Sequence, residues 1–442
     1  MKITIVGGTG YVGLTTAVGL ASKGHLVFCV GRTKEKLEKI SRGIPIIYED
    51  RLDELLKSVL KKGKLIPTID LTRSVQKSDV SFICVGTPSR QDGSIDLTQV
   101  EEVAKKIGKA LTGRKEYCVI TVKSTVIPGT TEKLVLPALE SFSKKRAGKD
   151  FGVCMTPEFL REGHAVKDFL FPKDQGIVIG EFDRKSGAVL YEIYKDFDAK
   201  ILRTDIRAAE MIKYARNSYL AKDVSFANEI SNICQELGVD YLDVKTGMEL
   251  DSRIGTGRFL SAGVGFGGSC FPKDVNALVA KAKEIGTKPR ILEATLEVNE
   301  AQPATLIKLT KQVIGELKGK KIGVLGLAFK PGTDDMREAP AIKVINGFLL
   351  EGAEVSAYDP EALDNARRIF GNKIVYVSKA KQAIASADAC VIVTEWPEFA
   401  DSRLYSKMRS KIIIDGRRLL DPGLLPADFT YHAIGFPKPI KT

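Results

Sequence analysis

The chain has 442 residues, of which 44% are hydrophobic and 28% charged, a composition typical of globular proteins with two or three domains. No apolar run approaches the roughly 18 residues of a membrane-spanning helix, and the start of the chain enters a strand-and-turn pattern rather than a signal peptide. The net charge of +12 comes from basic residues interleaved with acidic ones, without a basic tract. These features argue against membrane and nucleic-acid partners and favour a cytoplasmic location.

A strand, a glycine turn, a helix and a second strand open the chain. Residues 2–7 and 26–30 are the strands, and the turn between them reads G-x-G-x-x-G, with Gly8, Gly10, Tyr11, Val12 and Gly13 as its candidate cofactor residues. In this setting the glycines let the backbone approach a pyrophosphate, and the helix N-terminus meets its charge. The motif predicts a dinucleotide site; the alternative is another doubly wound turn.

The second strand ends unusually. A cofactor with a free ribose 2′-hydroxyl calls for Asp or Glu here, whereas this chain has Gly31, Arg32 and Thr33. An absent carboxylate with an adjacent arginine suits a 2′-phosphate, which indicates NADP+. The alternative is an NAD+ site that lacks its carboxylate.

Strands at 80–86, 117–125 and 176–180 alternate with helices, which predicts a parallel sheet covered on both faces. Residues 206–237 then form one helix that ends at Gly238, a candidate spine between domains. Lys213 and Asn217 share a face of this helix, although the residues alone favour a solvated surface lysine at 213.

A second α/β unit begins near residue 320 and repeats the opening order without the phosphate-binding glycines. The expected fold is α/β, with two Rossmann-like, doubly wound parallel-sheet domains joined by a long central helix and a helical dimerisation region. The predicted domains are 1–203 for the dinucleotide, 204–317 for the helices and the cysteine loop, and 318–442 for a nucleotide-like group.

Cys270 follows four glycines at 263–268 and precedes Pro272, Lys273 and Asp274. The other six cysteines lie in apolar contexts, and the chain has no metal-ligand spacing. A glycine-rich loop can hold a thiol near a substrate, and a neighbouring cation favours the reactive thiolate. The alternative is a structural turn with a buried cysteine.

Together these motifs resemble the UDP-glucose/GDP-mannose dehydrogenase family nearly end to end. The resemblance rests on GTGYVGL at 8–14, KSTVIPGT at 123–130, PEFLREG at 157–163, EMIKYARNSYLA at 210–221, GFGGSCFPKD at 265–274, GLAFKPGTDDMREAP at 326–340 and DGR at 415–417. It implies NAD(P)+-dependent, four-electron oxidation of UDP-glucose to UDP-glucuronate, with GDP-mannose as the alternative substrate. A plain two-electron dehydrogenase and an inactive nucleotide-binding regulator are the rival hypotheses.

The resemblance also implies roles for individual residues. The catalytic residues are Cys270, Lys213, Asp274, Thr125, Glu158 and Asn217, and no metal is expected. Besides Gly8, Gly10, Tyr11, Val12, Gly13 and residues 31–33, the cofactor residues are Lys36, Thr87, Thr125, Glu162, Lys273 and Arg337. The substrate residues are Glu158, Phe159, Leu160, Arg161, Glu162, Lys213, Asn217, Arg253, Phe259, Leu260, Ser261, Ala262, Gly263, Gly267, Lys330 and Arg417. Arg253 is expected to reach the partner's site in a homodimer.

Two features depart from the family pattern. Gly31 replaces the acidic residue after the second strand, so NAD+ is expected from the resemblance while NADP+ is plausible from residues 31–33. The segment after PEFLREG reads PKDQGIVIG at 172–180 and has no functional interpretation.

Overall fold

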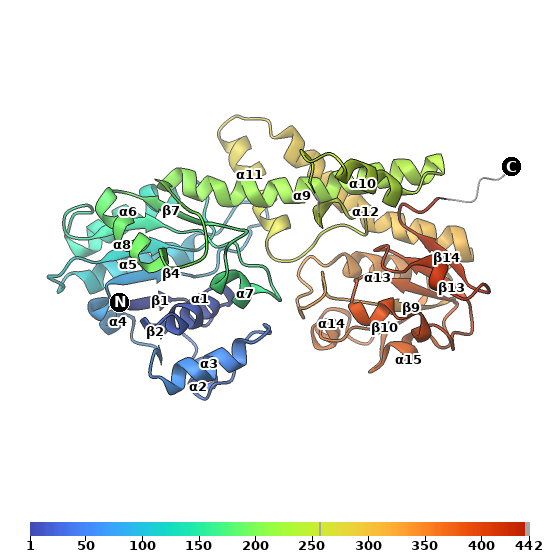
Figure 1. Cartoon of the computed structure of the whole chain (residues 1–442), viewed down its shortest axis with the longest axis horizontal. Helices are drawn as coiled ribbons and strands as arrows, with labels where there is room; N and C mark the ends of the chain where they lie inside the picture. Colours follow the sequence, from blue (N-terminus) through green and yellow to red (C-terminus); the bar gives the residue numbers. More distant parts are fainter. Residues whose placement is uncertain (256–257, 438–442) are drawn as a thin grey trace. The chain divides into compact units, whose positions relative to one another are not determined.

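A computed structural model describes residues 1–255 and 258–437 of the chain. The chain divides into two compact units, residues 1–216 and 217–442 (Figure 1). Within the described ranges, no helix is both long and apolar enough to cross a bilayer. The predicted division into three domains stays a prediction.

The first unit contains a mixed, eight-stranded sheet. Its strands are β1 (Lys2–Val6), β2 (Leu26–Val30), β3 (Leu65–Thr68), β4 (Val80–Ile83), β5 (Val119–Val122), β6 (Gly152–Met155), β7 (Ile177–Glu181) and β8 (Ile201–Asp205). The strand order is β3-β2-β1-β4-β5-β6-β7-β8. The first six strands run parallel, in the order of a Rossmann fold.

The expectation of a wholly parallel sheet is wrong at its far edge. Strand β7 pairs antiparallel with β6, and β8 runs parallel to β7. The connection from β6 to β7 contains a single helix, the six-residue α7 (Ala165–Leu170). A helix of about 9 Å is shorter than the strands, so it does not return the chain along the sheet, and β7 starts at the edge where β6 ends.

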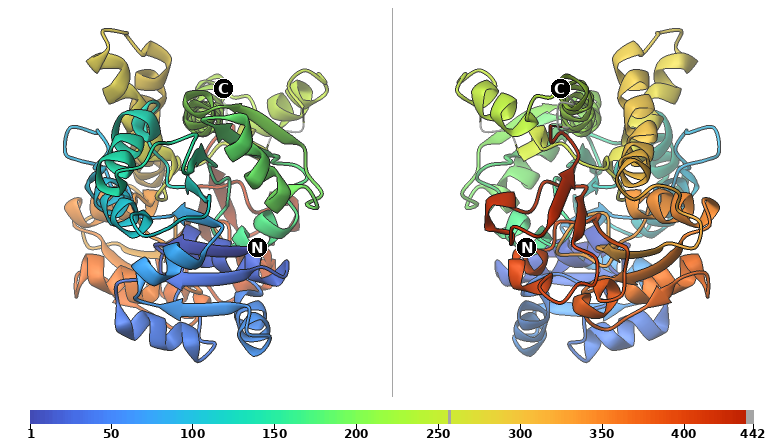
Figure 2. Two further views of the ribbon diagram at one scale, coloured as in Figure 1. Left: turned by 90° about the vertical axis from the view of Figure 1, so that its left-hand side faces the viewer. Right: turned by 90° about the vertical axis from the view of Figure 1, so that its right-hand side faces the viewer.

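Helices cover both faces of this sheet (Figure 2, left). They are α1 (Tyr11–Ser22), α2 (Lys34–Ser41), α3 (Leu52–Lys61), α4 (Leu71–Lys77), α5 (Thr98–Leu111), α6 (Leu136–Ser143) with a π-helical turn at Thr131–Val135, α7 and α8 (Arg184–Tyr194). Ile3 and Ile5 belong to one apolar cluster, and Val6 belongs to another. This alternation is what a strand buried on both faces requires.

Helix α9 (Ile206–Leu237) has the bounds that the sequence predicts. Its 32 residues span about 48 Å at the ordinary rise per residue. The second unit continues with α10 (Tyr241–Glu249), a 3-10 turn at Arg258–Leu260, α11 (Phe271–Glu284) and α12 (Arg290–Ile314).

A parallel, six-stranded sheet completes the second unit (Figure 2, right). Its strands are β9 (Lys321–Leu325), β10 (Glu354–Tyr358), β11 (Val375–Tyr376), β12 (Ala389–Ile392), β13 (Ile412–Asp415) and β14 (Thr430–Ala433). Its helices are α13 (Pro340–Leu350), α14 (Leu363–Phe370) and α15 (Ala380–Ile384), with 3-10 turns at Pro397–Ala400, Ser402–Leu404 and Pro422–Leu424. The order β11-β10-β9-β12-β13-β14 is equivalent to the order β3-β2-β1-β4-β5-β6 of the first sheet, which confirms the predicted internal repeat.

Asp359 holds the carboxyl edge of this second sheet together. The residue directly follows β10 and is fully buried. Its Oδ2 atom accepts N–H groups from Leu327 at 2.7 Å, Ala328 at 3.0 Å and the Trp396 indole at 3.0 Å. Its Oδ1 atom accepts the N–H groups of residues 361 and 362. One carboxylate therefore satisfies donors from three separate loops.

We expect Asp359→Asn to lower the free energy of unfolding by about 3 kcal/mol, because the amide NH2 group would face buried donors that lose their acceptor. Urea unfolding followed by fluorescence measures this, since Trp396, in the second unit, is the chain's single tryptophan. Asp364→Asn is the control, because the Asp364 side chain is 87% exposed. Equal stability of the two variants would contradict this role of Asp359.

Candidate functional site

The turn after β1 is built for close backbone approach. Gly7 has φ +91°, and a Cβ at Gly13 would lie 2.1 Å from the Gly7 oxygen. A Cβ at Gly8 would lie 2.5 Å from the Cys29 sulfur. Tyr11 begins α1 directly after Gly10. Only glycine fits at these positions, and the result is an open backbone at a helix N-terminus, which fits a pyrophosphate.

The adjoining strand ends carry several of the predicted cofactor residues. Gly31 is buried after β2, while Arg32, Thr33 and Lys36 are exposed. After β4, the Thr87 hydroxyl donates to the Thr125 carbonyl at 2.9 Å, which ties the β4 and β5 ends together. The predicted residues of this unit therefore gather at one edge of its sheet, where doubly wound folds bind ligands.

Glu158 and Lys213 form a buried ion pair in the first unit. The Lys213 Nζ atom lies 2.8 Å from Glu158 Oε1, and their side chains are 4% and 7% exposed. Burial by itself raises the pKa of Glu158, but the Lys213 ammonium, the Leu160 N–H and the Lys123 charge together hold it below its ordinary value. The expectation of a solvated Lys213 from the residues alone is wrong, because α9 turns this side chain into the protein.

The loop after β6 is held by two further carboxylates. Arg161 makes a two-pronged ion pair with Asp168, at 2.9 and 2.6 Å. Glu49, which the sequence analysis missed, is 8% exposed and accepts the N–H groups of Gly163 at 2.5 Å and Ala165 at 2.8 Å. It also accepts the Tyr11 hydroxyl, so it joins the glycine turn to the loop that carries residues 158–162.

The PKDQG segment, left without interpretation by the sequence, forms the turn between α7 and β7. The Gln175 carbonyl accepts Arg216 Nη1 at 2.9 Å, and the Arg216 guanidinium lies 3.7 Å from the centre of the Phe159 ring. The segment thereby helps to hold Arg216 against Phe159, which is a predicted substrate residue.

In the second unit, Cys270 lies at the N-cap of α11. It is partly exposed, whereas the other six cysteines are buried and all seven are free thiols. Burial raises the pKa of Cys29, Cys84 and Cys154 to about 12, which makes these thiols unreactive. Cys270 therefore combines exposure with a helix N-terminus, the setting that favours a thiolate.

Asp274 lies one helical turn after Cys270 and is 1% exposed. Its two oxygens accept Asn217 Nδ2 at 2.6 Å and Lys273 Nζ at 2.5 Å. The Asp274 N–H donates to the Cys270 carbonyl at 2.8 Å. The structure thus brings four predicted site residues together around the first turn of α11.

The glycine loop before Cys270 is fixed by amide side chains. Gly263 donates its N–H to Asn228 Oδ1 at 2.8 Å, and its carbonyl accepts Gln302 Nε2 at 2.8 Å. Asn299 bonds both backbone groups of Phe266, at 2.7 and 3.0 Å. Gln302 and Asn299 were missed, since both lie in the middle of α12, where polar residues are common. Gly265 (φ +97°) and Gly268 (φ +81°) adopt the left-handed backbone conformation that favours glycine.

Residues of the second sheet border this loop. A Cβ at Gly267 would lie 2.2 Å from the Glu338 oxygen, and the Gly268 N–H donates to the Arg337 carbonyl at 2.8 Å. Arg417 donates to the Gly265 carbonyl at 3.3 Å. The Arg337 side chain pairs with Asp335, and the Lys330 ammonium lies 5.7 Å from the Phe329 ring centre.

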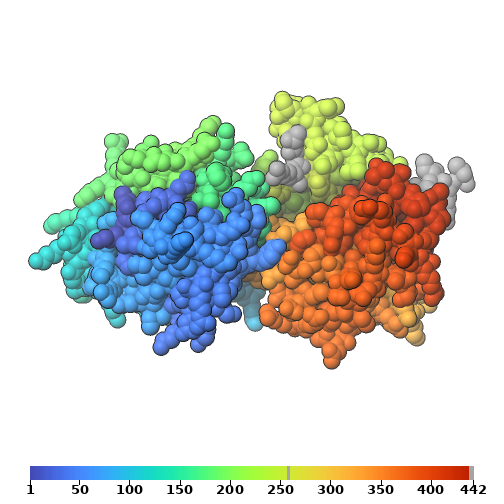
Figure 3. Space-filling model, turned by 60° about the horizontal axis from the view of Figure 1, so that its bottom comes forward, coloured from blue at the N-terminus to red at the C-terminus, as the bar shows by residue number. Residues whose placement is uncertain are grey.

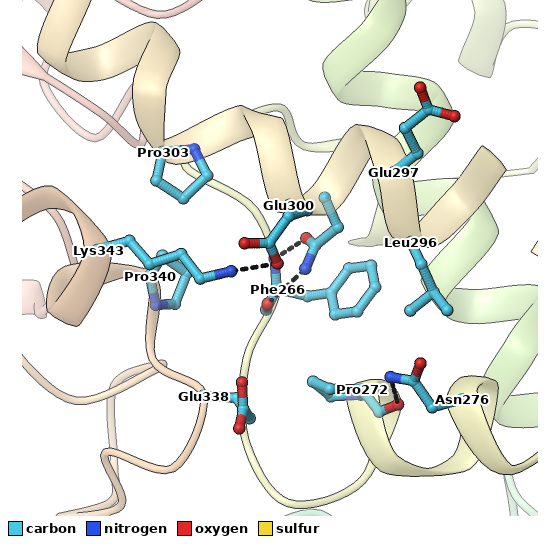
Figure 4. A pocket seen from close by; sticks show the side chains of 11 residues that line it. Phe266, Pro272, Asn276, Leu296, Glu297, Glu300, Pro303, Glu338, Pro340 and Lys343 are labelled. Carbon is cyan, nitrogen blue, oxygen red and sulfur yellow. Dashed lines mark hydrogen bonds and ion pairs between the residues drawn. The ribbon is translucent and has the colours of Figure 1, made fainter. Parts of the chain in front are cut away.

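A hollow of about 290 Å³ lies beside the same loop (Figure 4). Phe266 and Pro272 face it from the loop and from α11, and Pro303 and Glu300 face it from α12. An ion pair between Lys343 of α13 and Glu300 crosses it. The loop is thus supported by side chains rather than by a strand.

The remaining substrate candidates lie after α10. Arg253 is 88% exposed and pairs with Asp251 at 2.5 Å. Leu260 and Ala262 are buried, and the Leu260 carbonyl accepts the Tyr241 hydroxyl at 2.8 Å. Phe259 lies against Phe271, and Ser261 is exposed.

We expect Glu158→Gln to destabilise the chain by about 3 kcal/mol at neutral pH, because Lys213 would be buried without its carboxylate. The pair's contribution is present above the unfolded pKa of Glu158 and is lost as the pH falls through its lowered folded pKa, so the difference narrows in acid. Urea unfolding followed by circular dichroism measures both effects. Glu101→Gln breaks the exposed Glu101–Lys105 pair and should cost less than about 1 kcal/mol; a larger loss there would undermine the comparison.

Comparison with known proteins identifies the family. Sequence models of three domains of the UDP-glucose/GDP-mannose dehydrogenase family match this chain: the NAD binding domain at residues 1–198, the central domain at 207–301 and the UDP binding domain at 323–422.

Similar proteins match over almost their whole length. The UDP-glucose 6-dehydrogenase TuaD of Bacillus subtilis is 42% identical over 441 residues, which cover 99% of this chain and 94% of that protein. AglM of Haloferax volcanii, also named a UDP-glucose 6-dehydrogenase, is 41% identical, covering 95% and 97%. A solved UDP-glucose dehydrogenase from Pyrobaculum islandicum has a TM-score of 0.90 and 38% identity, covering 98% and 97%. The chain belongs to the UDP-glucose/GDP-mannose dehydrogenase family.

Proposed function

We propose that this protein oxidises UDP-glucose to UDP-glucuronate with two equivalents of NAD(P)+, through a covalent intermediate on Cys270. The observation that supports this most is the position of Cys270: it is a partly exposed thiol at the N-cap of α11, and Asp274 lies one turn away. The relatives named above are UDP-glucose dehydrogenases. GDP-mannose is the alternative substrate, since a solved GDP-mannose dehydrogenase is 37% identical to this chain.

The glycine turn after β1 fits the cofactor because the absence of Cβ atoms at Gly8 and Gly13 lets the strand, the turn and the start of α1 pack closely. The bound nicotinamide supplies a hydride acceptor for each oxidation step. Tyr11, Val12 and the strand-end residues Thr87 and Thr125 would hold the dinucleotide. Lys36, Glu162, Lys273 and Arg337 are the further cofactor residues that the proposal includes.

The first oxidation removes a hydride and a proton from the primary alcohol and gives an aldehyde. The Cys270 thiolate adds to this aldehyde, forming a C–S bond and a thiohemiacetal. Loss of a second hydride gives a thioester, and water then breaks the C–S bond, releasing the carboxylate and the thiol. Overall, an alcohol, a water molecule and two oxidised cofactors give a carboxylate, two reduced cofactors and three protons.

Four polar side chains would serve these steps. Lys213, buried beside Glu158, is suited to stabilising negative charge that develops on oxygen. Asp274, which Asn217 and Lys273 hold by hydrogen bonds, is suited to orienting and deprotonating water. Thr125 and Asn217 would order that water. The backbone at 158–162, the segment 259–263, Gly267, Lys330 and Arg417 would bind the sugar nucleotide.

We also propose a homodimer formed through α9. Tyr219, Phe226 and Ile233 are spaced by seven residues on this helix and are 61%, 45% and 50% exposed in the single chain. Large apolar side chains at heptad spacing form a stripe that a second copy can cover. In the dimer, the exposed Arg253 would reach the partner's substrate site. A cytoplasmic location remains an expectation from the sequence.

The yield of reduced cofactor per UDP-glucose consumed tests the covalent scheme. We expect two equivalents, together with UDP-glucuronate, from the wild type. Cys270→Ala should abolish uronate formation while UDP-glucose still binds, as isothermal titration would measure. Cys234→Ala, which changes a buried cysteine of the same unit, is the control. One equivalent from the wild type would indicate a simple alcohol dehydrogenase, and normal turnover by Cys270→Ala would exclude the thioester.

Phe226→Asp should separate the dimer into chains of 48.2 kDa, because the carboxylate would be buried against the partner's apolar stripe. Light scattering after size exclusion measures the mass. The same variant should raise KM for UDP-glucose, as should Arg253→Ala within an intact dimer. Leu350→Asp on α13, where the side chain is 88% exposed, is the control. A dimeric Phe226→Asp would remove α9 from the interface, and an unchanged KM in Arg253→Ala would remove Arg253 from the site.

A further inference from the structure

A side chain at position 31, directly after β2, would crowd the glycine turn. A Cβ built on Gly31 would lie 2.4 Å from Thr9 Cγ2, 3.1 Å from Thr9 Oγ1 and 3.2 Å from Leu37 Cδ2. Thr9 belongs to the glycine turn itself, so its side chain would have to shift to admit a carboxylate at the place where one would accept a ribose 2′-hydroxyl. The packing around Gly31 thus disfavours the acidic residue of an NAD+ site.

The next residue, Arg32, is exposed and held in place. Its Nη2 atom donates to Gln99 Oε1 at 3.0 Å, and Gln99 lies in the first turn of α5. The Gln99 amide also lies 4.0 Å from a Cβ built on Gly86, which follows β4. Since β1 lies between β2 and β4, the guanidinium extends across the point where the strand order reverses. This contact uses one of its five N–H donors.

The surrounding charges are mainly positive. Arg32, Lys34 and Lys36 follow β2 within six residues, against the single acidic Glu35. Thr33 is the N-cap of α2, and its hydroxyl makes no capping hydrogen bond. Asp70, which follows the neighbouring β3, is engaged as the N-cap of α4 through the Arg73 N–H at 2.9 Å. Figure 3 shows the α2 side of this unit, in blue, as open surface.

We propose that this edge selects a cofactor with a 2′-phosphate, so that the enzyme prefers NADP+ to NAD+. The proposal rests on the proposed function only in requiring that the chain bind a nicotinamide dinucleotide. A phosphate offers acceptors that the planar Arg32 fork can bind in a two-pronged manner, and Thr33, the next residue, adds a hydroxyl that makes no capping hydrogen bond. A free 2′-hydroxyl meets no carboxylate here and gains no comparable contact.

Binding, rather than turnover, tests this preference. We expect fluorescence titration to give a Kd for NADPH at least about tenfold below that for NADH, as one charge-assisted contact would produce. Calorimetry should give the same order for the adenosine-end probes 2′,5′-ADP and 5′-AMP. Arg32→Ala should weaken NADPH about tenfold or more and leave NADH nearly unchanged. Arg42→Ala, which removes an exposed arginine at the other end of α2, is the charge-matched control and should change neither.

A reciprocal variant tests the role of Thr9. Thr9→Ala combined with Gly31→Asp admits a carboxylate where the threonine methyl group stood, and we expect it to reverse the NADPH-to-NADH affinity ratio. Gly31→Asp alone should change the NADPH-to-NADH affinity ratio less, because the Thr9 side chain crowds the new aspartate. Circular dichroism and thermal melting check that each variant folds. Equal Kd values for NADPH and NADH that Arg32→Ala does not change would overturn the proposed NADP+ preference but not the proposed function. Failure of either dinucleotide to bind would overturn the proposed function with it.

Discussion

Buried carboxylates are the feature on which the loops of this protein depend. Loops at the carboxyl edge of a sheet carry backbone N–H groups with no strand partner, and a buried donor without an acceptor is costly. Glu49 satisfies the loop after β6, Glu210 accepts the N–H groups of residues 129 and 131, and Asp359 serves the second sheet. Glu158 and Asp274 are also buried carboxylates that accept hydrogen bonds, from the Lys213 ammonium and the Asn217 amide respectively.

This arrangement connects stability to chemistry. A carboxylate that accepts several hydrogen bonds fixes both its own position and that of the loops around it. In the first unit, Glu158 pairs with Lys213 within the protein, and in the second, Asp274 anchors the first turn of α11 next to Cys270. The proposed reaction needs a fixed cation and a fixed base, and each is supplied by a contact that also maintains the fold.

Local patterns predicted much of this structure. Helix α9 was predicted to the residue, because 32 positions without glycine or proline leave no other interpretation. The glycine turn, the Cys270 loop and the repeated strand order followed from motifs with strict backbone demands. Long-range features could not be predicted: the reversal of β7, the burial of Lys213, and the contacts of Glu49, Asn299 and Gln302 depend on which segments meet in space. Exposure at Arg32 and the clash at Gly31 are likewise properties of packing.

The repeated strand order gives the end of β10 a particular significance. Gly7 and Gly326 follow the first strand of each sheet with φ of +91° and +92°, and Gly31 and Asp359 follow the second. In the second sheet, the aspartate turns inward and occupies the N–H groups of the first turn. In the first sheet, Gly31 provides no carboxylate, and the Gly8 N–H donates to the Val30 carbonyl at 2.9 Å instead. The turn after β9 therefore carries its own anion, whereas the turn after β1 has none at this position.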